Sequence, residues 1–171
     1  MVTSASADPT EFSPRTPAGN LTTTLDSRLI GFAAGRSIGA LATLKRDGRP
    51  HLSAVNFTLS PATAIARISV IDDRVIVNNM RRDPRVSIFV ASLDGWTYAV
   101  LEGTVELSPV ALAPDDDTVA ELVDLFRAIR GEDHPDWDDY RAAMVADHRL
   151  VARLRVERVY GLVRPQYATS A

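Results

Sequence analysis

The sequence predicts a mainly β domain, a barrel of mostly antiparallel strands with a few helices packed on its outside. Short apolar segments separated by turn residues fill residues 37–107, and no helices alternate with them as a doubly wound parallel sheet would need. In the first segments, apolar side chains occupy both alternating sets of positions, which is typical of a sheet buried on both faces. We therefore expect helices, or a second copy of the chain, to cover the outer face of the barrel.

Six segments have the length and composition of strands. Gly, Pro, Asn and Asp at the joins between them favour turns, and a helical turn is expected over residues 79–83. Apolar residues at helical spacing predict helices near residues 25–34, 116–130 and 137–148. The predicted strands are Ser37 to Lys45, His51 to Leu59, Thr63 to Ile71, Arg85 to Ser92, Trp96 to Leu107 and Leu150 to Val163.

The length and composition predict one domain. The chain has 171 residues, 46% of them hydrophobic and 24% charged, enough to fill one core and keep it soluble. Residues 1–22, rich in Ser, Thr and Pro, are interpreted as a tail, residues 23–165 as the domain and residues 166–171 as a second tail. The apolar stretches are too short to span a membrane, and the opening residues do not resemble a secretory signal, so we expect a cytoplasmic protein.

Several function classes are disfavoured. The formal net charge of −3 offers no cationic field for nucleic acid. The chain has no cysteine, and its three histidines lack metal-ligand spacing. The G-x-S-x-G pattern from Gly35 to Gly39 follows a predicted helix and precedes a predicted strand, the reverse of the order in a nucleophile elbow. We therefore expect neither a metal site nor a serine hydrolase.

The segment from Arg74 to Arg85 is the most informative for function. It gathers four further polar or cationic residues beside a predicted strand end: Asn78, Asn79, Arg81 and Arg82. Guanidinium groups bind phosphate and carboxylate oxygens, which favours an anionic ligand. A solvated turn in which the arginines pair with neighbouring carboxylates is the alternative.

Five motifs together resemble the pyridoxamine 5′-phosphate oxidase-like split-barrel proteins. They are Ser37 to Thr43, Asp47 to His51, Asn79 to Arg85, Asp94 to Tyr98 and Val159 to Gly161. The order of the motifs is more specific than any one of them, and the likeness is greatest to the actinobacterial branch that uses the deazaflavin coenzyme F420. The resemblance implies a six-stranded antiparallel split barrel of the FMN-binding type, a homodimer, and cofactor sites at the dimer interface.

The resemblance also implies site residues. The strand after the Gly48-Arg49-Pro50 turn would line the ring pocket, and the next strand and its exit would hold the phosphate, with a tryptophan reaching over from the partner chain. Where the family usually has a Lys followed by a polar residue, this chain has Ile76 and Val77. The implied cofactor-binding residues are His51, Ser53, Asn56, Ser69, Arg74, Asn79 and Trp96.

Three hypotheses of function follow from the resemblance. The first is a homodimeric F420-dependent reductase that transfers a hydride to an unsaturated small molecule, with no catalytic acid or base assigned. The second is an FMN-dependent oxidoreductase on the same barrel. The third, favoured by the apolar Ile76 and Val77, is a binding protein without redox chemistry.

Overall fold

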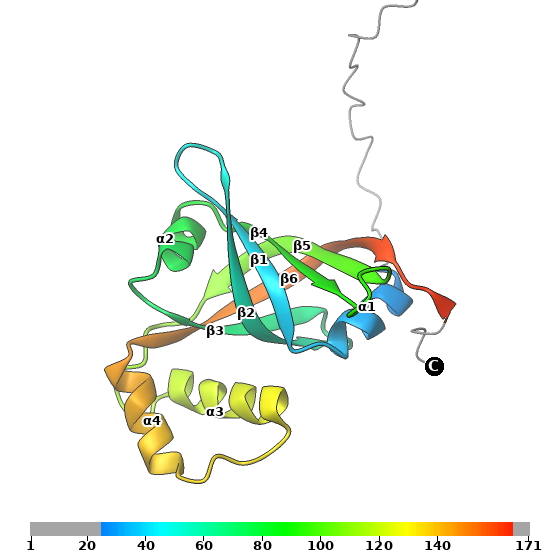
Figure 1. The fold of residues 1–171 in the computed structure, drawn as a ribbon. Coiled ribbons are helices and arrows are strands. Elements are labelled where there is room, and N and C mark those ends of the chain that lie inside the picture. The colour runs from blue at the N-terminus through cyan, green and yellow to red at the C-terminus, as the bar shows by residue number, and fades with distance from the viewer. Residues whose placement is uncertain (1–24, 166–171) are drawn as a thin grey trace, which may run out of the picture.

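Six antiparallel strands close into a barrel in the computed structural model, which describes residues 25–165 (Figure 1). Neighbouring strands follow the order β1-β2-β3-β6-β5-β4 around the barrel. The six-stranded antiparallel barrel predicted from the sequence is therefore confirmed, whereas both predicted tails lie outside the described residues. The strands are β1 (Ile38–Leu44), β2 (Pro50–Ser60), β3 (Ile65–Ile71), β4 (Arg85–Ala91), β5 (Tyr98–Leu107) and β6 (Arg149–Leu162).

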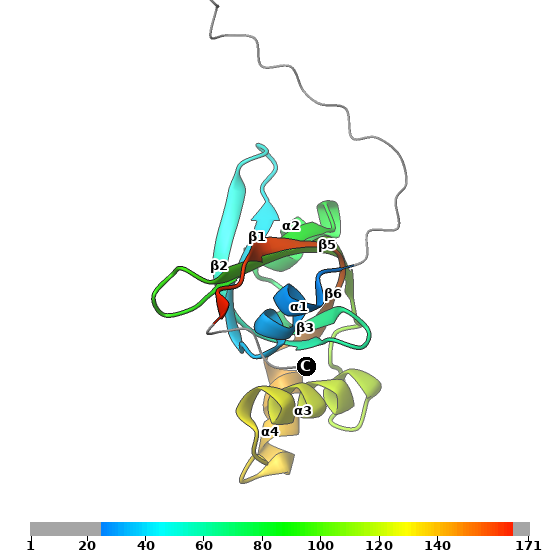
Figure 2. The same cartoon turned by 90° about the vertical axis from the view of Figure 1, so that its right-hand side faces the viewer.

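The first helix, α1 (Ser27–Ala34), packs against one end of the barrel, as the two views of the ribbon show (Figure 2). Asp26 begins the helix, and its side chain accepts a hydrogen bond of 2.9 Å from the backbone N–H of Arg28. The apolar side of α1 joins the core inside the barrel, so the predicted helix near residues 25–34 is confirmed.

Two helices, α3 (Asp117–Arg130) and α4 (Trp137–Ala146), lie together on one outer side of the barrel (Figures 1 and 2). Asp116 caps α3 at its start, and Gly131 ends it with a left-handed φ of 70°. A second apolar cluster forms beneath the pair and includes Val151 of β6, whose neighbours Leu150 and Ala152 face the barrel core. Both faces of this part of β6 are therefore buried.

The helix α2 (Val75–Arg82) differs from the prediction, which placed one helical turn over residues 79–83. The helix begins four residues earlier, and the β-branched run from Val75 to Val77 forms its first turn. Val77 and Met80, three residues apart, are both buried in the barrel core. Tertiary burial of this helical face outweighs the strand propensity of its first residues.

The outer face of β1, β4 and the start of β2 is apolar, and no helix among residues 25–165 covers it. Large side chains on this face include Ile38, Leu52 and Phe89, which are 66%, 67% and 45% exposed. The strand register places Ala40 of β1 beside Phe89, Phe89 beside Val100, and Val100 beside Tyr160. One apolar row therefore crosses four neighbouring strands.

We expect an ion pair in the turn between α2 and β4 to stabilise the fold at neutral pH and to be lost at acidic pH. Hydrogen bonds from the Arg85 side chain and then its backbone lower the pKa of Asp83 to about 2. The Asp83 carboxylate accepts from Arg85 Nε at 2.9 Å and from Nη2 at 2.7 Å. Because this pKa lies below that of an unfolded chain, about 3.9, the contribution is present above that value and is lost as the pH falls through about 2.

Urea unfolding of the wild type and of Asp83→Asn between pH 5 and pH 2 measures this contribution. The variant should lose less stability than the wild type across the interval, because Asn has no carboxyl to protonate. Equal losses in the two proteins would show that the pair does not stabilise the fold.

Candidate functional site

A pocket of about 470 Å³ opens where α3 and α4 meet the outer side of β2 and β3. Three of the residues implied by the resemblance line it, Asn56 from β2, Ser69 from β3 and Arg74 from the start of α2. Further lining residues come from β2, β3 and α2, and the opposite wall comes from the C-terminal half of the chain, including Phe126 and Ile129 of α3 and Arg149 of β6. The pocket therefore joins polar groups of the barrel to an apolar helical wall.

Backbone pairing brings two of the three arginines that line this pocket, Arg74 and Arg149, to the same strand end. Ile71, the last residue of β3, pairs with Arg149, the first residue of β6. The backbone N–H of Arg74 donates to the carbonyl oxygen of Ile71 at 3.2 Å. The backbones of Arg74 and Arg149 are thus both next to Ile71, although 74 residues lie between the two arginines in the chain.

The Arg74 side chain is exposed, and among residues 25–165 it forms no hydrogen bond or ion pair. The nearby carboxylate of Asp72 is instead paired with Arg81 of α2. This pairing offsets a negative charge that would otherwise oppose an anion beside Arg74. The donors on the barrel side of the pocket, the side chains of Arg74, Arg149, Ser69 and Asn56, match the oxygens of a phosphate or carboxylate group.

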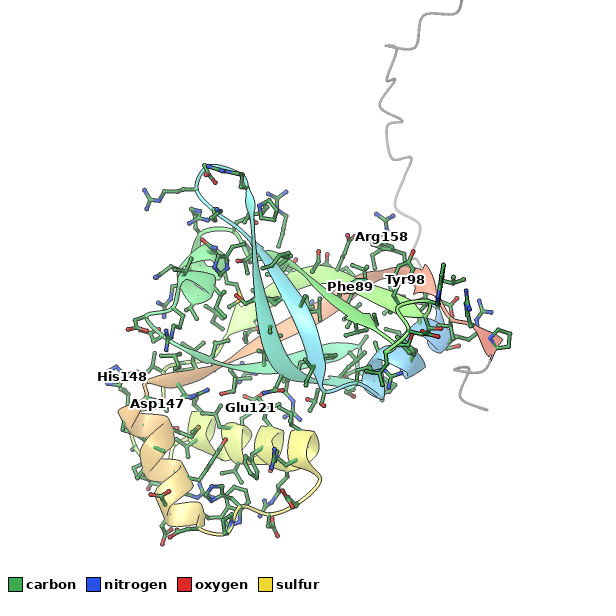
Figure 3. The ribbon with its side chains drawn as sticks, in the orientation of Figure 1. Phe89, Tyr98, Glu121, Asp147, His148 and Arg158 are labelled. Atoms are coloured by element: carbon green, nitrogen blue, oxygen red, sulfur yellow. The ribbon has the colours of Figure 1, made fainter. Side chains whose placement is uncertain are left out.

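Arg149 is held by two contacts at the rim of the pocket. Its Nε and Nη2 atoms each donate to Oδ2 of Asp147 at 3.2 Å, and its Nη1 atom donates to Ser69 Oγ at 3.3 Å. Figure 3 shows Asp147 and His148 at the turn from α4 into β6. The carbonyl oxygen of His148 accepts from the N–H of Asp72 at 3.1 Å, which fixes this turn against the end of β3.

Aromatic side chains form the outer wall of the pocket. The rings of Phe126 and Tyr140 meet edge to face with centroids 5.1 Å apart, and Trp137 and His134 pack against both. Burial raises the pKa of the Tyr140 hydroxyl, which donates to the carbonyl oxygen of Leu122 at 3.1 Å. Tyr140 is therefore held as a structural donor, and its ring presents an apolar edge to the pocket.

One carboxylate links α3 to the barrel, in addition to the apolar cluster beneath the helix. Glu121 accepts from Arg153 Nε of β6 at 3.0 Å and lies 3.9 Å from Nη1 of Arg67 on β3. In Figure 3, Glu121 lies between the helix and the barrel. Because α3 supplies Leu125, Phe126 and Ile129 to the pocket, this contact keeps the apolar wall in place.

Four of the implied site residues do not line this pocket. His51 and Ser53 lie on the same face of β2, with His51 Nδ1 3.4 Å from Ser53 Oγ. Asn79 is buried and donates to Thr43 Oγ1 at 3.0 Å, and Thr43 is the register partner of His51. These three residues lie near the inner face of the sheet at the α2 end of the barrel.

Trp96 lies on the loop between β4 and β5, where it is exposed and stacks under the Arg164 guanidinium at 4.7 Å. Trp96 is not among the residues that line the pocket, and Tyr98, two residues further along the chain, lies far from Asp147 in Figure 3. Trp96 therefore does not reach the pocket of its own chain.

The two apolar residues at the start of α2 have different surroundings. Ile76 lines the pocket, whereas Val77 is fully buried in the barrel core. An apolar residue at position 77 is explained by core packing, and a longer cationic side chain at position 76 would extend into the pocket.

Sequence reasoning did not find Phe126, Tyr140 or Arg149 as pocket residues. Each of these residues lies more than 50 positions beyond Arg74 in the chain, and no motif links them to it. The structure begins β6 at Arg149, one residue before the predicted start at Leu150, so the sequence did not mark this arginine as a strand residue. Among residues 25–165 no cluster of three or more His, Asp or Glu side chains could hold a metal ion. None of the helices in the same range is long and apolar enough to cross a membrane.

Comparison with known proteins places the fold and the sequence in one family. The family described as Pyridoxamine 5'-phosphate oxidase matches residues 26–162. An F420H(2)-dependent biliverdin reductase of Mycobacterium tuberculosis is 32% identical over 143 residues, which cover 83% of this chain and 91% of the relative.

Solved structures show the same fold. A conserved hypothetical protein of Mycobacterium tuberculosis superposes with a TM-score of 0.65 at 18% identity, covering 91% of this chain and 95% of its own. A protein titled F420 Reductase superposes with a TM-score of 0.56 at 22% identity, covering 82% of this chain and 98% of its own. With its closed barrel and its match over nearly all described residues, the chain belongs to the pyridoxamine 5′-phosphate oxidase family.

Proposed function

We propose that the chain is a cytoplasmic, homodimeric, F420-dependent reductase that acts on an unsaturated small molecule. The observation that carries the proposal is the composition of the pocket, which has arginines and hydroxyls at one end and an apolar wall at the other. A cofactor with a flat ring and an anionic tail would place its tail at the polar end of the pocket and its ring against the apolar wall. The 32% identity to an F420H(2)-dependent biliverdin reductase favours the deazaflavin over other such cofactors.

Each group in the pocket has a part in this proposal. Arg74, whose side chain has no competing partner among residues 25–165, binds the phosphate of the cofactor. Asn56 of β2 lines the same pocket and donates to polar atoms of the cofactor. Leu125, Phe126 and Ile129 of α3 exclude water from the bound cofactor. The cofactor, when bound in its reduced form, supplies the hydride, so the protein needs to position the ring rather than provide a nucleophile.

The homodimer is proposed from the apolar face formed by β1, β4 and the neighbouring part of β2. Ile38, Leu52 and Phe89 would be removed from water by a second copy of the same face, at about 25 cal/mol for each Å² buried. The exposed Trp96 loop would then be available to the site of the partner chain, and the partner would complete a wall that one chain leaves open.

Titration of the dialysed protein with F420 and with FMN, followed by the fluorescence of each cofactor, tests the proposal. We expect F420 to bind with the lower dissociation constant, and the complex to oxidise reduced F420 when an unsaturated acceptor is added. Tighter binding of FMN would favour the flavin-dependent alternative on the same barrel. If neither cofactor binds at high micromolar concentration, the protein is a binding protein without this redox chemistry.

A further inference from the structure

We propose that Arg149 is a second ligand of the anionic group bound in the pocket, and that Asp147 is the residue that positions it. The inference deepens the proposed function and rests on it, because the anion meant is the phosphate that F420 and FMN share. It concerns a residue at the start of the last strand, 75 positions beyond Arg74.

The location of Arg149 is the first argument. It lines the same pocket as Ser69 and Arg74, and its side chain is 28% exposed, so it is partly desolvated and still reachable from the pocket. Its Nη1 atom donates to Ser69 Oγ at 3.3 Å. A ligand oxygen that contacts this hydroxyl is therefore within reach of the Arg149 guanidinium as well.

The donor count is the second argument. An arginine side chain carries five N–H groups in one plane. Asp147 accepts from the Nε and Nη2 atoms, and Ser69 accepts from Nη1, which uses three of them. The remaining N–H groups include one on Nη1, the nitrogen nearest to Ser69, and this group is available for a ligand oxygen.

The role of Asp147 follows from the edge of the guanidinium that it occupies. By binding the Nε and Nη2 edge, the Asp147 carboxylate turns the Nη1 end toward Ser69. Asp147 itself is about half exposed and does not line the pocket. It orients the arginine without contacting the ligand, so the expected effect of losing it is indirect.

The third argument is the small number of positive charges in the pocket near the end of β3. Ile76 of α2 lines the same pocket and supplies no charge, so the cations near the end of β3 are Arg74 and Arg149. The third arginine of the pocket, Arg130 of α3, is 61% exposed and lies 3.4 Å from Glu132. Arg149 is thus the better placed of the two to share an anion with Arg74.

The test compares Arg149→Gln with a matched control, Arg155→Gln. Arg155 lies on the same strand, is exposed, does not line this pocket, and its side chain forms no hydrogen bond or ion pair among residues 25–165. We expect Arg149→Gln to raise the F420 dissociation constant at least tenfold, the loss of about one charge-assisted contact, and Arg155→Gln to change it less than twofold. Melting temperatures of both variants show that the fold is retained.

A rescue variant separates a ligand contact from a structural effect. Ile76→Lys places a cation in the same pocket from α2, and in the Arg149→Gln background it should restore most of the lost affinity. The restored binding should weaken more steeply with salt than wild-type binding, because a flexible exposed charge is more readily screened.

The positioning role is tested with two substitutions of Asp147. Asp147→Asn keeps an oxygen that can accept from Arg149 and should leave F420 binding unchanged or tighter, since a negative charge is removed. Asp147→Ala removes the acceptor and should weaken binding several-fold. Equal binding by Asp147→Ala and wild type would overturn the positioning role.

The outcomes distinguish this inference from the proposed function. If wild type binds F420 or FMN and Arg149→Gln binds equally well, the Arg149 inference is wrong and the proposed function stands. If wild type binds neither cofactor but binds inorganic phosphate in an Arg149-dependent way, the anion site is supported and the proposed function fails. If wild type binds none of the three, both are wrong.

Discussion

The variant Gly103→Ala is expected to destabilise the protein by about 3 kcal/mol, the upper end of the range for overpacking. Gly103 lies at a register shift where β5 pairs with β6, so that Glu102 is opposite Arg158 and Gly103 is opposite Val156. A Cβ atom at Gly103 would lie 1.9 Å from the carbonyl oxygen of Arg155. Because this neighbour is backbone in the middle of a ladder, relieving the clash would break strand pairing.

The matched control for this variant is Gly31→Ala in α1, where an added Cβ meets nothing within 4 Å. That substitution should stabilise the protein by about 0.5 to 1 kcal/mol, since Ala loses less backbone entropy than Gly in a helix. Urea unfolding of the two variants measures both effects. A value for Gly103→Ala within 1 kcal/mol of wild type would mean that the strands adjust at the bulge more easily than the register indicates.

The variant Phe89→Glu is expected to convert the proposed homodimer into monomers at micromolar concentration. Phe89 is near the middle of the apolar row that crosses β1, β4, β5 and β6, and its ring lies 6.0 Å from that of Tyr98. A two-fold axis through this face would bring two introduced carboxylates close together in an apolar interface. Burial of unpaired charges opposes association strongly.

Light scattering coupled to size-exclusion chromatography measures this effect. Wild type should have twice the chain mass of 18.6 kDa, and Phe89→Glu should have the mass of one chain. Leu112→Glu is the control, because Leu112 is 81% exposed on the segment before α3, away from this face. A wild-type mass near 18.6 kDa would reject the dimer.

The strands and the outer helices could be predicted from the sequence because each has its own periodic pattern. Turn residues such as Asp47 and Gly48 separate the strands, and the apolar stripe of α3 continues to the left-handed Gly131. The helix α2 was predicted too short because its first residues, Val75 to Val77, favour strands when they are considered alone. Their burial against the barrel depends on residues distant in the sequence.

The candidate site was predictable in part for a similar reason. Asn56, Ser69 and Arg74 lie outside the five motifs but were implied as site residues by the family resemblance, and the pocket brings them together. Phe126 and Arg149 enter the pocket through the packing of α3 and the pairing of β6 with β3, which no local pattern records. Asn79 belongs to a family motif but contacts Thr43 and Arg82 rather than the pocket.

If the pocket beside Arg74 is the cofactor site, Arg74→Ala should bind F420 more weakly than wild type, and the dissociation constants of the two proteins measure this. The guanidinium has no partner among residues 25–165, so its removal should barely change the melting temperature. The dissociation constant should rise at least tenfold, as expected from about 1.5 kcal/mol for one charge-assisted contact. Equal F420 affinity in the two proteins would contradict the account and place the cofactor elsewhere.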